Sequence, residues 1–145
     1  MSVSKTQARS RARRGAVQAI YQWQLGGGSS TGIRVEFRER DGMKDVDWGF
    51  FDELVDGVIN NCDELDQALL PFLDREISAL DPVERAILRI SAHQFRAHIE
   101  VPYKVVISEG VQLARTFGAD QSHRYINGVL DSLSRELRPH EPHPK

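Results

Sequence analysis

Residues 81–98 read DPVERAILRISAHQFRAH, and this stretch decides the fold. Asp81 can cap a helix, Pro82 suits its first position, and Glu84 stands where a capping box places its carboxylate. Apolar residues then cover most of the helix circumference, which indicates a helix at the centre of a domain. One strip of that helix is basic, and it consists of Arg85, Arg89, His93 and Arg96. We interpret this strip as a solvated edge beside a buried helix, or else as a second basic surface.

Helical periodicity continues on both sides of this stretch. Apolar residues recur at helical spacing in the segments 8–25, 47–61, 63–73 and 101–118, and from about 125 to Pro139. Asp45 or Asp47 can cap the second of these segments, and Pro71 should bend or end the third. Because strand signals are nearly absent and the connections are short, the sequence predicts one all-α domain of six or seven helices.

Residues 33–41, IRVEFRERD, fit two kinds of structure. Ile33, Val35 and Phe37 alternate as in a strand, but Ile33 and Phe37 also have the i, i+4 spacing of a helix. The pattern alone leaves both structures open.

The charge of the chain is segregated although its total is small. The 145 residues carry 19 Lys and Arg against 21 Asp and Glu, for a net charge of −2. Residues 1–35 contain six bases and no acid, residues 36–88 contain 15 acids and five bases, and residues 89–145 contain eight bases and six acids. The basic end favours an anionic partner, with a solvated tail as the alternative, and a uniformly basic nucleic-acid binder is excluded.

The first helical segment has an apolar face and a polar face. At about 100° per residue, the apolar stripe consists of Ala12, Ala16, Ala19, Ile20 and Trp23. Tyr21 points outward beside Arg11 and Arg14, with Gln18 on the same face. Arginine binds phosphate, an aromatic ring stacks on an unpaired base and glutamine can read a base edge, so this face suits single-stranded RNA. Alternatively, Tyr21 covers a neighbouring loop.

Arginine occupies four of the six positions from Arg9 to Arg14. Repulsion among these side chains destabilises the free helix, so we expect an anion to order this turn. The sequence therefore predicts a basic N-terminal arm (1–14) within a single helical RNA-binding domain (1–138).

Residue patterns typical of catalytic, cofactor and metal sites are missing from the sequence. Cys62 is the only cysteine, which excludes an internal disulfide, and its acidic neighbours should raise its pKa. The GGGSSTG loop lacks the Gly-Lys-Ser/Thr ending of a phosphate-binding loop. His93, His98 and His123 are far apart in sequence, so no metal site is predicted. We expect a protein that is not an enzyme and uses no cofactor.

Two further expectations concern the tail and the location. The ending RPHEPHPK has three prolines and no other apolar residue, which predicts disorder for residues 139–145. No apolar stretch approaches the roughly 18–20 residues that span a bilayer, and no signal peptide is apparent. We expect a cytoplasmic protein that does not contact a membrane.

Extended strings across the chain resemble the NusB family of bacterial transcription antitermination proteins. They are RRGAVQAIYQWQ at 13–24, KDVDWGFFDELVDGV at 44–58, DPVERAILRIS at 81–91, VPYKVVISEGVQLARTFG at 101–118 and SHRYINGVLDSLSRELRP at 122–139. The resemblance implies about seven helices, arranged as two packed three-helix bundles plus an extra helix. It also implies a helix for residues 33–41.

The resemblance implies a function as well. Proteins of this family pair with the tenth protein of the small ribosomal subunit, which doubles as an elongation factor. The pair binds boxA elements of nascent RNA, notably ribosomal RNA, and joins a complex on RNA polymerase that suppresses termination. From the outward face of the first helix and the resemblance together, the expected RNA-binding residues are Arg9, Arg11, Arg13, Arg14, Gln18, Tyr21, Lys104, His123, Arg124 and Tyr125.

Glu84 matches a position at the ribosomal-protein interface of the family. Gln121 departs from relatives that often carry a second acid after Ala119-Asp120, which affects the expected affinity at that turn. The alternative function is a helical protein-interaction module without intrinsic RNA binding. A small nuclease would need a convergent carboxylate or histidine cluster in the fold, and self-association into a homodimer stays open.

Overall fold

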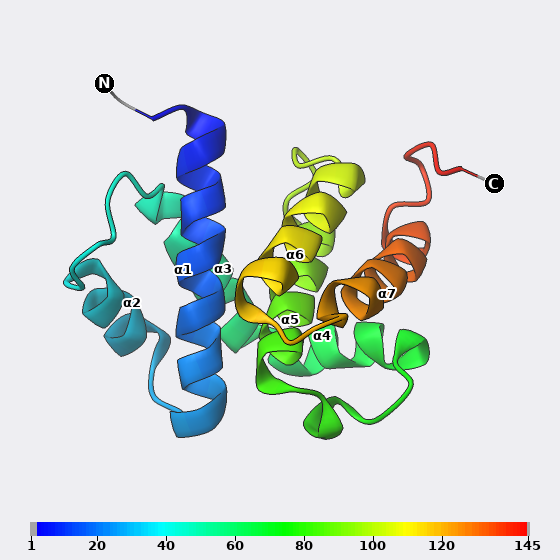
Figure 1. Cartoon of the computed structure of the whole chain (residues 1–145), viewed down its shortest axis with the longest axis horizontal. Helices are drawn as coiled ribbons and strands as arrows, with labels where there is room; N and C mark the ends of the chain where they lie inside the picture. The colour runs from blue at the N-terminus through cyan, green and yellow to red at the C-terminus, as the bar shows by residue number, and fades with distance from the viewer. Residues whose placement is uncertain (1–2, 145) are drawn as a thin grey trace.

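The computed structural model describes residues 3–144, in which all regular elements are helices (Figure 1). The elements are α1 (Lys5–Gly26), α2 (Ser30–Arg38), α3 (Trp48–Asn60), α4 (Cys62–Leu69), α5 (Pro82–Ala97), α6 (Tyr103–Phe117) and α7 (Ser122–Leu137), with short 3-10 turns η1 (Leu70–Phe72) and η2 (Ile77–Ala79). The predicted all-α class is confirmed. None of the helices in residues 3–144 has both the length and the apolar character to cross a bilayer.

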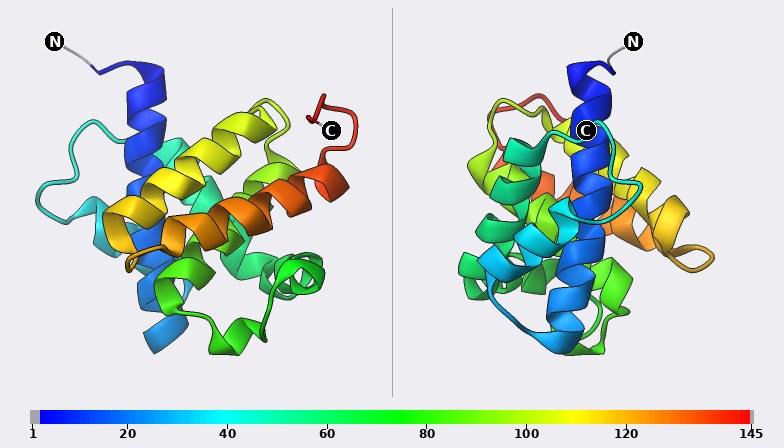
Figure 2. Two further views of the ribbon diagram at one scale, coloured as in Figure 1. Left: turned by 45° about the vertical axis from the view of Figure 1, so that its right-hand side comes forward. Right: turned by 90° about the vertical axis from the view of Figure 1, so that its left-hand side faces the viewer.

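The helices form two groups that share α5 as their common support. Helices α1, α2 and α3 pack against one another, and so do α5, α6 and α7. Helix α4 packs on α5, and α5 also contacts α1 and α3. Figure 2 shows α6 (yellow) and α7 (orange to red) side by side with their directions opposed. The arrangement is two three-helix bundles plus an extra helix, as the resemblance implied.

Helix α5 is central because its sequence leaves almost no polar face. Every residue from Ala86 to Phe95 is buried. At its start, the Asp81 carboxylate accepts the backbone N–H of Val83 at 2.8 Å, so Asp81 is the predicted cap.

The basic strip of α5 is largely buried between helices, which corrects the expected solvated edge. The Arg89 guanidinium pairs with Asp66 of α4 at 2.8 Å and donates to Gln24 of α1 at 3.0 Å. His93 is also buried, against α3. Of the four residues, only Arg96 is exposed, and Arg85 is half-buried. The strip therefore joins α5 to its neighbours.

Helix α1 begins earlier than predicted. Ser4 and Gln7 form a reciprocal capping box, with Ser4 Oγ accepting from Gln7 N and Gln7 Oε1 accepting from Ser4 N, both at 3.1 Å. Most of the predicted basic arm, residues 5–14, therefore belongs to the first half of a continuous helix. Arg9, Arg11 and Arg13 pair with acids of this chain, as described below, which offsets much of the expected repulsion without an external anion.

Residues 33–41 fall mainly in helix α2, in agreement with the resemblance. Ile33 and Phe37 are both buried, whereas Val35 is 52% exposed. The i, i+4 pair therefore faces the core, and the strand-like alternation is incidental.

The segment after α7 is packed, which corrects the prediction of a disordered tail for residues 139–144; Lys145 lies outside the described residues. The buried guanidinium of Arg138 donates to four backbone carbonyls, those of Gln94, Phe95, His98 and Val101. The Glu141 carboxylate accepts the backbone N–H of Tyr103 at 2.9 Å. The Tyr103 ring stacks on His143 with 4.0 Å between centroids. Residues 138–143 thus cap both the end of α5 and the start of α6.

Candidate nucleic-acid interface

The outward face of α1 is a row of exposed polar and aromatic side chains. Arg14, Gln18 and Tyr21 are exposed, and 39% of the surface of Tyr21 is accessible to solvent. Ala12, Ala16, Ala19 and Ile20 are fully buried on the opposite side. The helical wheel therefore predicted the orientation of both faces correctly.

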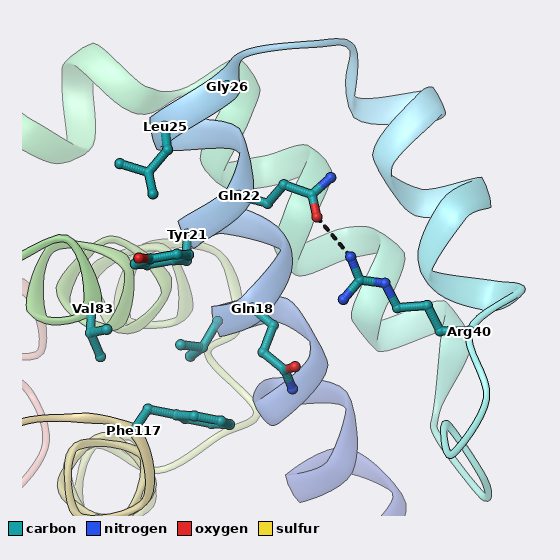
Figure 3. A pocket seen from close by; sticks show the side chains of 9 residues that line it. Gln18, Tyr21, Gln22, Leu25, Gly26, Arg40, Val83 and Phe117 are labelled. Atoms are coloured by element: carbon teal, nitrogen blue, oxygen red, sulfur yellow. Dashed lines mark hydrogen bonds between the residues drawn. The ribbon is translucent and has the colours of Figure 1, made fainter.

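A hollow of about 570 Å³ opens beside Tyr21. Figure 3 shows the Tyr21 ring at its wall, with Val83 of α5 and Phe117 of α6 across from α1. On the other side, Gln22 Oε1 accepts from the Arg40 guanidinium at 2.7 Å. The hollow is open and its walls are mainly apolar, so the exposed ring of Tyr21 can receive a flat group against one face.

A second hollow, of about 490 Å³, lies farther toward the start of α1 and is more polar. Arg11, Arg14 and Gln18 line it together with residues 42–46. The Arg11 guanidinium donates to the Lys44 carbonyl at 3.2 Å and pairs with Asp45 at 3.3 Å. Arg11 therefore fixes the wall of this hollow, and Arg14, which also borders a neighbouring hollow against α6, is the more available cation.

Arg9 is mostly engaged within the protein. Its guanidinium lies 4.1 Å from the centroid of the Phe50 ring and pairs with Glu100 at 3.4 Å and Asp47 at 3.8 Å. An anionic partner would have to compete with these two acids for Arg9.

Arg13 is buried, and this corrects its assignment to the RNA surface. Only 3% of its side chain is exposed, Nε donates to Gln94 Oε1 at 2.9 Å, and Nη1 pairs with Glu109 at 3.5 Å. Burial lowers the pKa of Arg13, opposed by the charge of Glu109. The physical reason is helical phase, because Arg13 shares its face with buried Ala16, Val17 and Ile20.

The remaining expected RNA contacts fall at two places. Lys104 is exposed at the start of α6, whereas His123 and Arg124 lie at the start of α7, beside the far end of α6. A helix of 15 residues is about 22 Å long, so Lys104 does not share a patch with the other two.

Tyr125 contacts the segment between η1 and η2. Its hydroxyl donates to Asp74 Oδ1 at 3.0 Å, and its ring lies 5.6 Å from the Arg75 guanidinium. Burial raises the pKa of Tyr125. In the free protein its hydroxyl is an anchor for this loop.

Glu84 lines a hollow of about 220 Å³ between the starts of α5 and α7. Its carboxylate does not close a capping box but accepts from Ser122 Oγ at 2.6 Å. Asp81 and Asp120 contribute further acidic groups, and Arg75, which also lines the hollow, is paired with Asp74 at 2.7 Å. Gln121 adopts a left-handed conformation with φ of 70°. The arrangement suits a basic side chain from a partner. Ser122 and Asp120 were not among the predicted site residues, since Ser122 contacts Glu84 only through the tertiary fold.

The sequence is similar to known proteins over nearly its whole length. The sequence model described as the NusB family matches residues 10–135. The chain is 50% identical over 135 residues to the transcription antitermination protein NusB of Idiomarina loihiensis, covering 93% of this chain and 97% of the relative. It is 48% identical over 134 residues to the protein of that name from Acinetobacter baumannii, covering 92% of this chain and 90% of the relative.

Solved structures share the fold. NusB of T. maritima superimposes with a TM-score of 0.80 at 22% identity, covering 94% of each chain. A chain from the crystal structure of the antitermination factors NusB and NusE in complex with dsRNA gives a TM-score of 0.79 at 24% identity, covering 90% of this chain and 98% of that one. The family match over residues 10–135 and the relative that is 50% identical over 93% of the chain lead to one conclusion: the chain belongs to the NusB family.

Proposed function

We propose that this protein is a non-catalytic RNA-binding adaptor of transcription antitermination. Together with the tenth protein of the small ribosomal subunit, it binds boxA-type single-stranded RNA in nascent transcripts, notably ribosomal RNA. The pair then joins a complex on RNA polymerase, in the cytoplasm, that suppresses termination. The relatives' name and the structural neighbour solved with NusE and dsRNA support this class of function.

The single observation that carries the proposal is the outward face of α1. Arg14, Gln18 and Tyr21 follow one another along exposed helix surface, and each lines an open hollow. In this role Arg14 binds phosphate, Tyr21 stacks on a base and Gln18 hydrogen-bonds to a base edge. Arg11, which lines the same polar hollow as Arg14, and Arg124 extend the positive surface, and His123 lies next to Arg124.

The acidic hollow around Glu84 is the proposed contact for the ribosomal protein. Such a protein is rich in basic side chains, and bringing it to this surface offsets the acidic repulsion of RNA. The pair should therefore bind RNA more tightly than either protein alone.

The test is a titration of boxA RNA with the chain, with and without the ribosomal protein, across a salt series. Binding should tighten when the partner is present. A plot of log K against log[salt] should fall with a slope of about −0.7 for each neutralised phosphate of a single strand. A duplex of the same sequence serves as the competitor. Equal affinity with and without the partner, or no dependence on salt, contradicts the proposal.

A second candidate function is supported by the apolar walls of the hollow at Tyr21, which also suit a protein side chain. In that case the chain is an interaction module or a homodimer that does not bind RNA directly. The double variant Arg11→Ala, Arg14→Ala then leaves RNA binding by the ribosomal-protein pair unchanged, whereas the adaptor function predicts that it weakens.

A further inference from the structure

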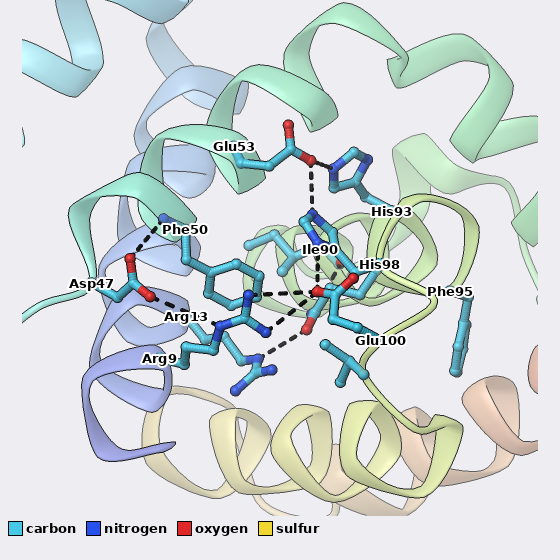
Figure 4. A network of polar contacts seen from close by, with 12 residues as sticks. Arg9, Arg13, Asp47, Phe50, Glu53, Ile90, His93, Phe95, His98 and Glu100 are labelled. Carbon is cyan, nitrogen blue, oxygen red and sulfur yellow. Dashed lines mark hydrogen bonds and ion pairs between the residues drawn. The ribbon is translucent and has the colours of Figure 1, made fainter. Parts of the chain in front are cut away.

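Two histidines and a glutamate meet where α3 packs against the end of α5 (Figure 4). Glu53 Oε1 lies 2.5 Å from His93 Nε2 and 2.8 Å from His98 Nε2. Candidate ligand atoms of all three side chains lie within 4.8 Å of one another. The cluster involves none of the residues assigned above to RNA or to the ribosomal protein.

Both ring nitrogens of His98 face carboxylate oxygens. Nε2 faces Glu53, and Nδ1 faces Glu100 Oε2 at 3.1 Å. An ionised carboxylate only accepts hydrogen bonds, and a neutral imidazole has one N–H. A neutral imidazole at this position donates to only one of the two carboxylates, and a cation on Nε2 would satisfy the other. A metal ion at Nε2 leaves the remaining proton on Nδ1, where Glu100 accepts it.

The backbone of α3 is shaped to admit the His93 ring. A Cβ on Gly57 would lie 2.1 Å from Cε1 and 2.2 Å from Nε2 of that ring. Glycine therefore lets the imidazole lie directly against the helix, and Glu53, one turn earlier, is on the same face.

Exposure differs across the cluster in a way that suits a bound ion. The His93 and His98 side chains are 6% and 12% exposed, whereas Glu53 is 43% exposed. The nitrogens are thus held by packing, and solvent reaches the site from the carboxylate side. Glu100 is itself held by the Arg9 guanidinium at 3.4 Å, so the group behind His98 is fixed in turn.

We propose that Glu53, His93 and His98 form a binding site for a divalent transition-metal ion, with Zn²⁺ as the best match. Two imidazoles and one carboxylate, with water in the fourth position, form a common Zn²⁺ ligand set, whereas Mg²⁺ and Ca²⁺ prefer oxygen ligands. A carboxylate on the far nitrogen of a metal-bound histidine, as Glu100 is placed, orients the ring.

Occupancy requires the three side chains to adjust their separations. Ligands at about 2.0–2.1 Å from a tetrahedral Zn²⁺ are about 3.3 Å apart, so the Glu53 oxygen must move away from each nitrogen by less than about 1 Å, and the two nitrogens, which lie within 4.8 Å of each other, must approach to that separation. Glu53 is the most exposed of the three and can make that movement. The bound ion ties α3 to the end of α5, a structural role independent of RNA binding.

The experiment measures Zn²⁺ binding by the full, untagged chain. Equilibrium dialysis with metal analysis should give one Zn²⁺ per chain, and Co²⁺ in its place should give the intense visible absorption of a tetrahedral site. The melting temperature should rise with Zn²⁺ concentration, because the ion binds the folded state. Absence of stoichiometric binding shows that the cluster is a hydrogen-bonded network only and overturns the proposal.

Variants locate the bound ion. Glu53→Gln and His98→Gln should each lower Zn²⁺ affinity at least tenfold, and Glu100→Gln should lower it about 10- to 100-fold without removing a ligand. His140→Gln, on the exposed tail, is the matched control and should bind as the parent does. Circular dichroism confirms that each variant is folded at these partly exposed positions. Unchanged affinity in both Glu53→Gln and His98→Gln, or a loss in His140→Gln, contradicts the assignment.

Discussion

Adjacent arginines on α1 have opposite roles. Arg13 is buried against Gln94 and Glu109, whereas Arg14 is exposed at the border of two hollows. Because successive residues of a helix point about 100° apart, one step along the chain takes a guanidinium from the core to the surface. The same residue type therefore stabilises the fold at one position and is available to a ligand at the next.

Alanine at the two positions should separate these roles. Arg13→Ala removes a buried hydrogen bond to Gln94 and an ion pair with Glu109, which should cost about 1–3 kcal/mol in the free energy of unfolding measured in urea. Arg14→Ala should change that free energy by less than about 0.5 kcal/mol. In RNA titrations Arg14→Ala should instead reduce the slope of log K against log[salt] by about 0.7, because one phosphate contact is lost. If folded Arg13→Ala shows the same decrease in the slope of log K against log[salt], Arg13 does contact RNA.

Tyr21 offers a test of stacking by a single residue. Tyr21→Ala should weaken RNA binding by about 1–3 kcal/mol, the usual contribution of a base stacked on an aromatic ring. Tyr21→Phe keeps the ring and should retain most of the affinity, which fluorescence titration can measure. If both variants lose the same affinity, the hydroxyl makes the contact and stacking is not involved.

At the scale of the helices, local signals predicted most of the elements, and distant contacts decided the rest. Asp47 and Asp81 cap α3 and α5 as their positions in the sequence predicted. The pairing of Arg13 with Glu109 and of His93 with Glu53 joins residues far apart in the chain, so no local pattern could reveal it. The order of the tail was missed for the same reason, because Arg138 finds its partners on α5 and in the α5–α6 connection.

Two glycines within helices should respond oppositely to alanine. Gly57→Ala forces a methyl group into the His93 ring and should destabilise the fold by about 1–3 kcal/mol. Gly128 of α7 has open space around the corresponding Cβ position, so Gly128→Ala should stabilise by about 0.5–1 kcal/mol. Thermal and urea unfolding measure both; stabilisation by Gly57→Ala would show that the ring is free to leave α3.

The cap of α6 should make stability depend on acid pH. The Tyr103 N–H, followed by Arg138, holds the pKa of Glu141 below its ordinary value of 4.5. A carboxylate with a lower pKa in the folded state stabilises fully above the unfolded pKa, and this contribution is lost as pH falls below about 4.5 through the folded pKa. Glu141→Gln should therefore be less stable than the parent at pH 7, and the difference should shrink toward pH 3. A difference that stays constant with pH contradicts this role.

Across the whole molecule, two surfaces of different character meet at the start of α5. Val83 lines the mainly apolar hollow beside Tyr21, and Glu84, the next residue, lines the acidic hollow beside α7. Much of the acidic middle of the sequence is neutralised locally, for example Asp66 by Arg89 and Asp52 by Arg38. The hollow at Glu84 differs in gathering three acids, Asp81, Glu84 and Asp120, around one opening.

This separation predicts that the two binding activities can be removed independently. Glu84→Gln removes a charge yet can still accept from Ser122, so it should lower affinity for the ribosomal protein and leave RNA binding by the chain alone unchanged. Arg14→Ala should do the reverse. Calorimetry with each partner measures both effects, and loss of both activities in either variant would indicate one shared surface.

The late position of Arg138 in the sequence determines when the packing of α5 can be completed during synthesis. Its guanidinium supplies the donors for four carbonyls at and just beyond the end of α5, and it follows all seven helices. While the ribosome is extending the chain, the central helix stays uncapped until α7 has been made, because no earlier residue occupies that position. The native packing is thus completed only after the last helix has emerged, and nascent chains stopped before residue 138 should be far more sensitive to proteases than chains that include it.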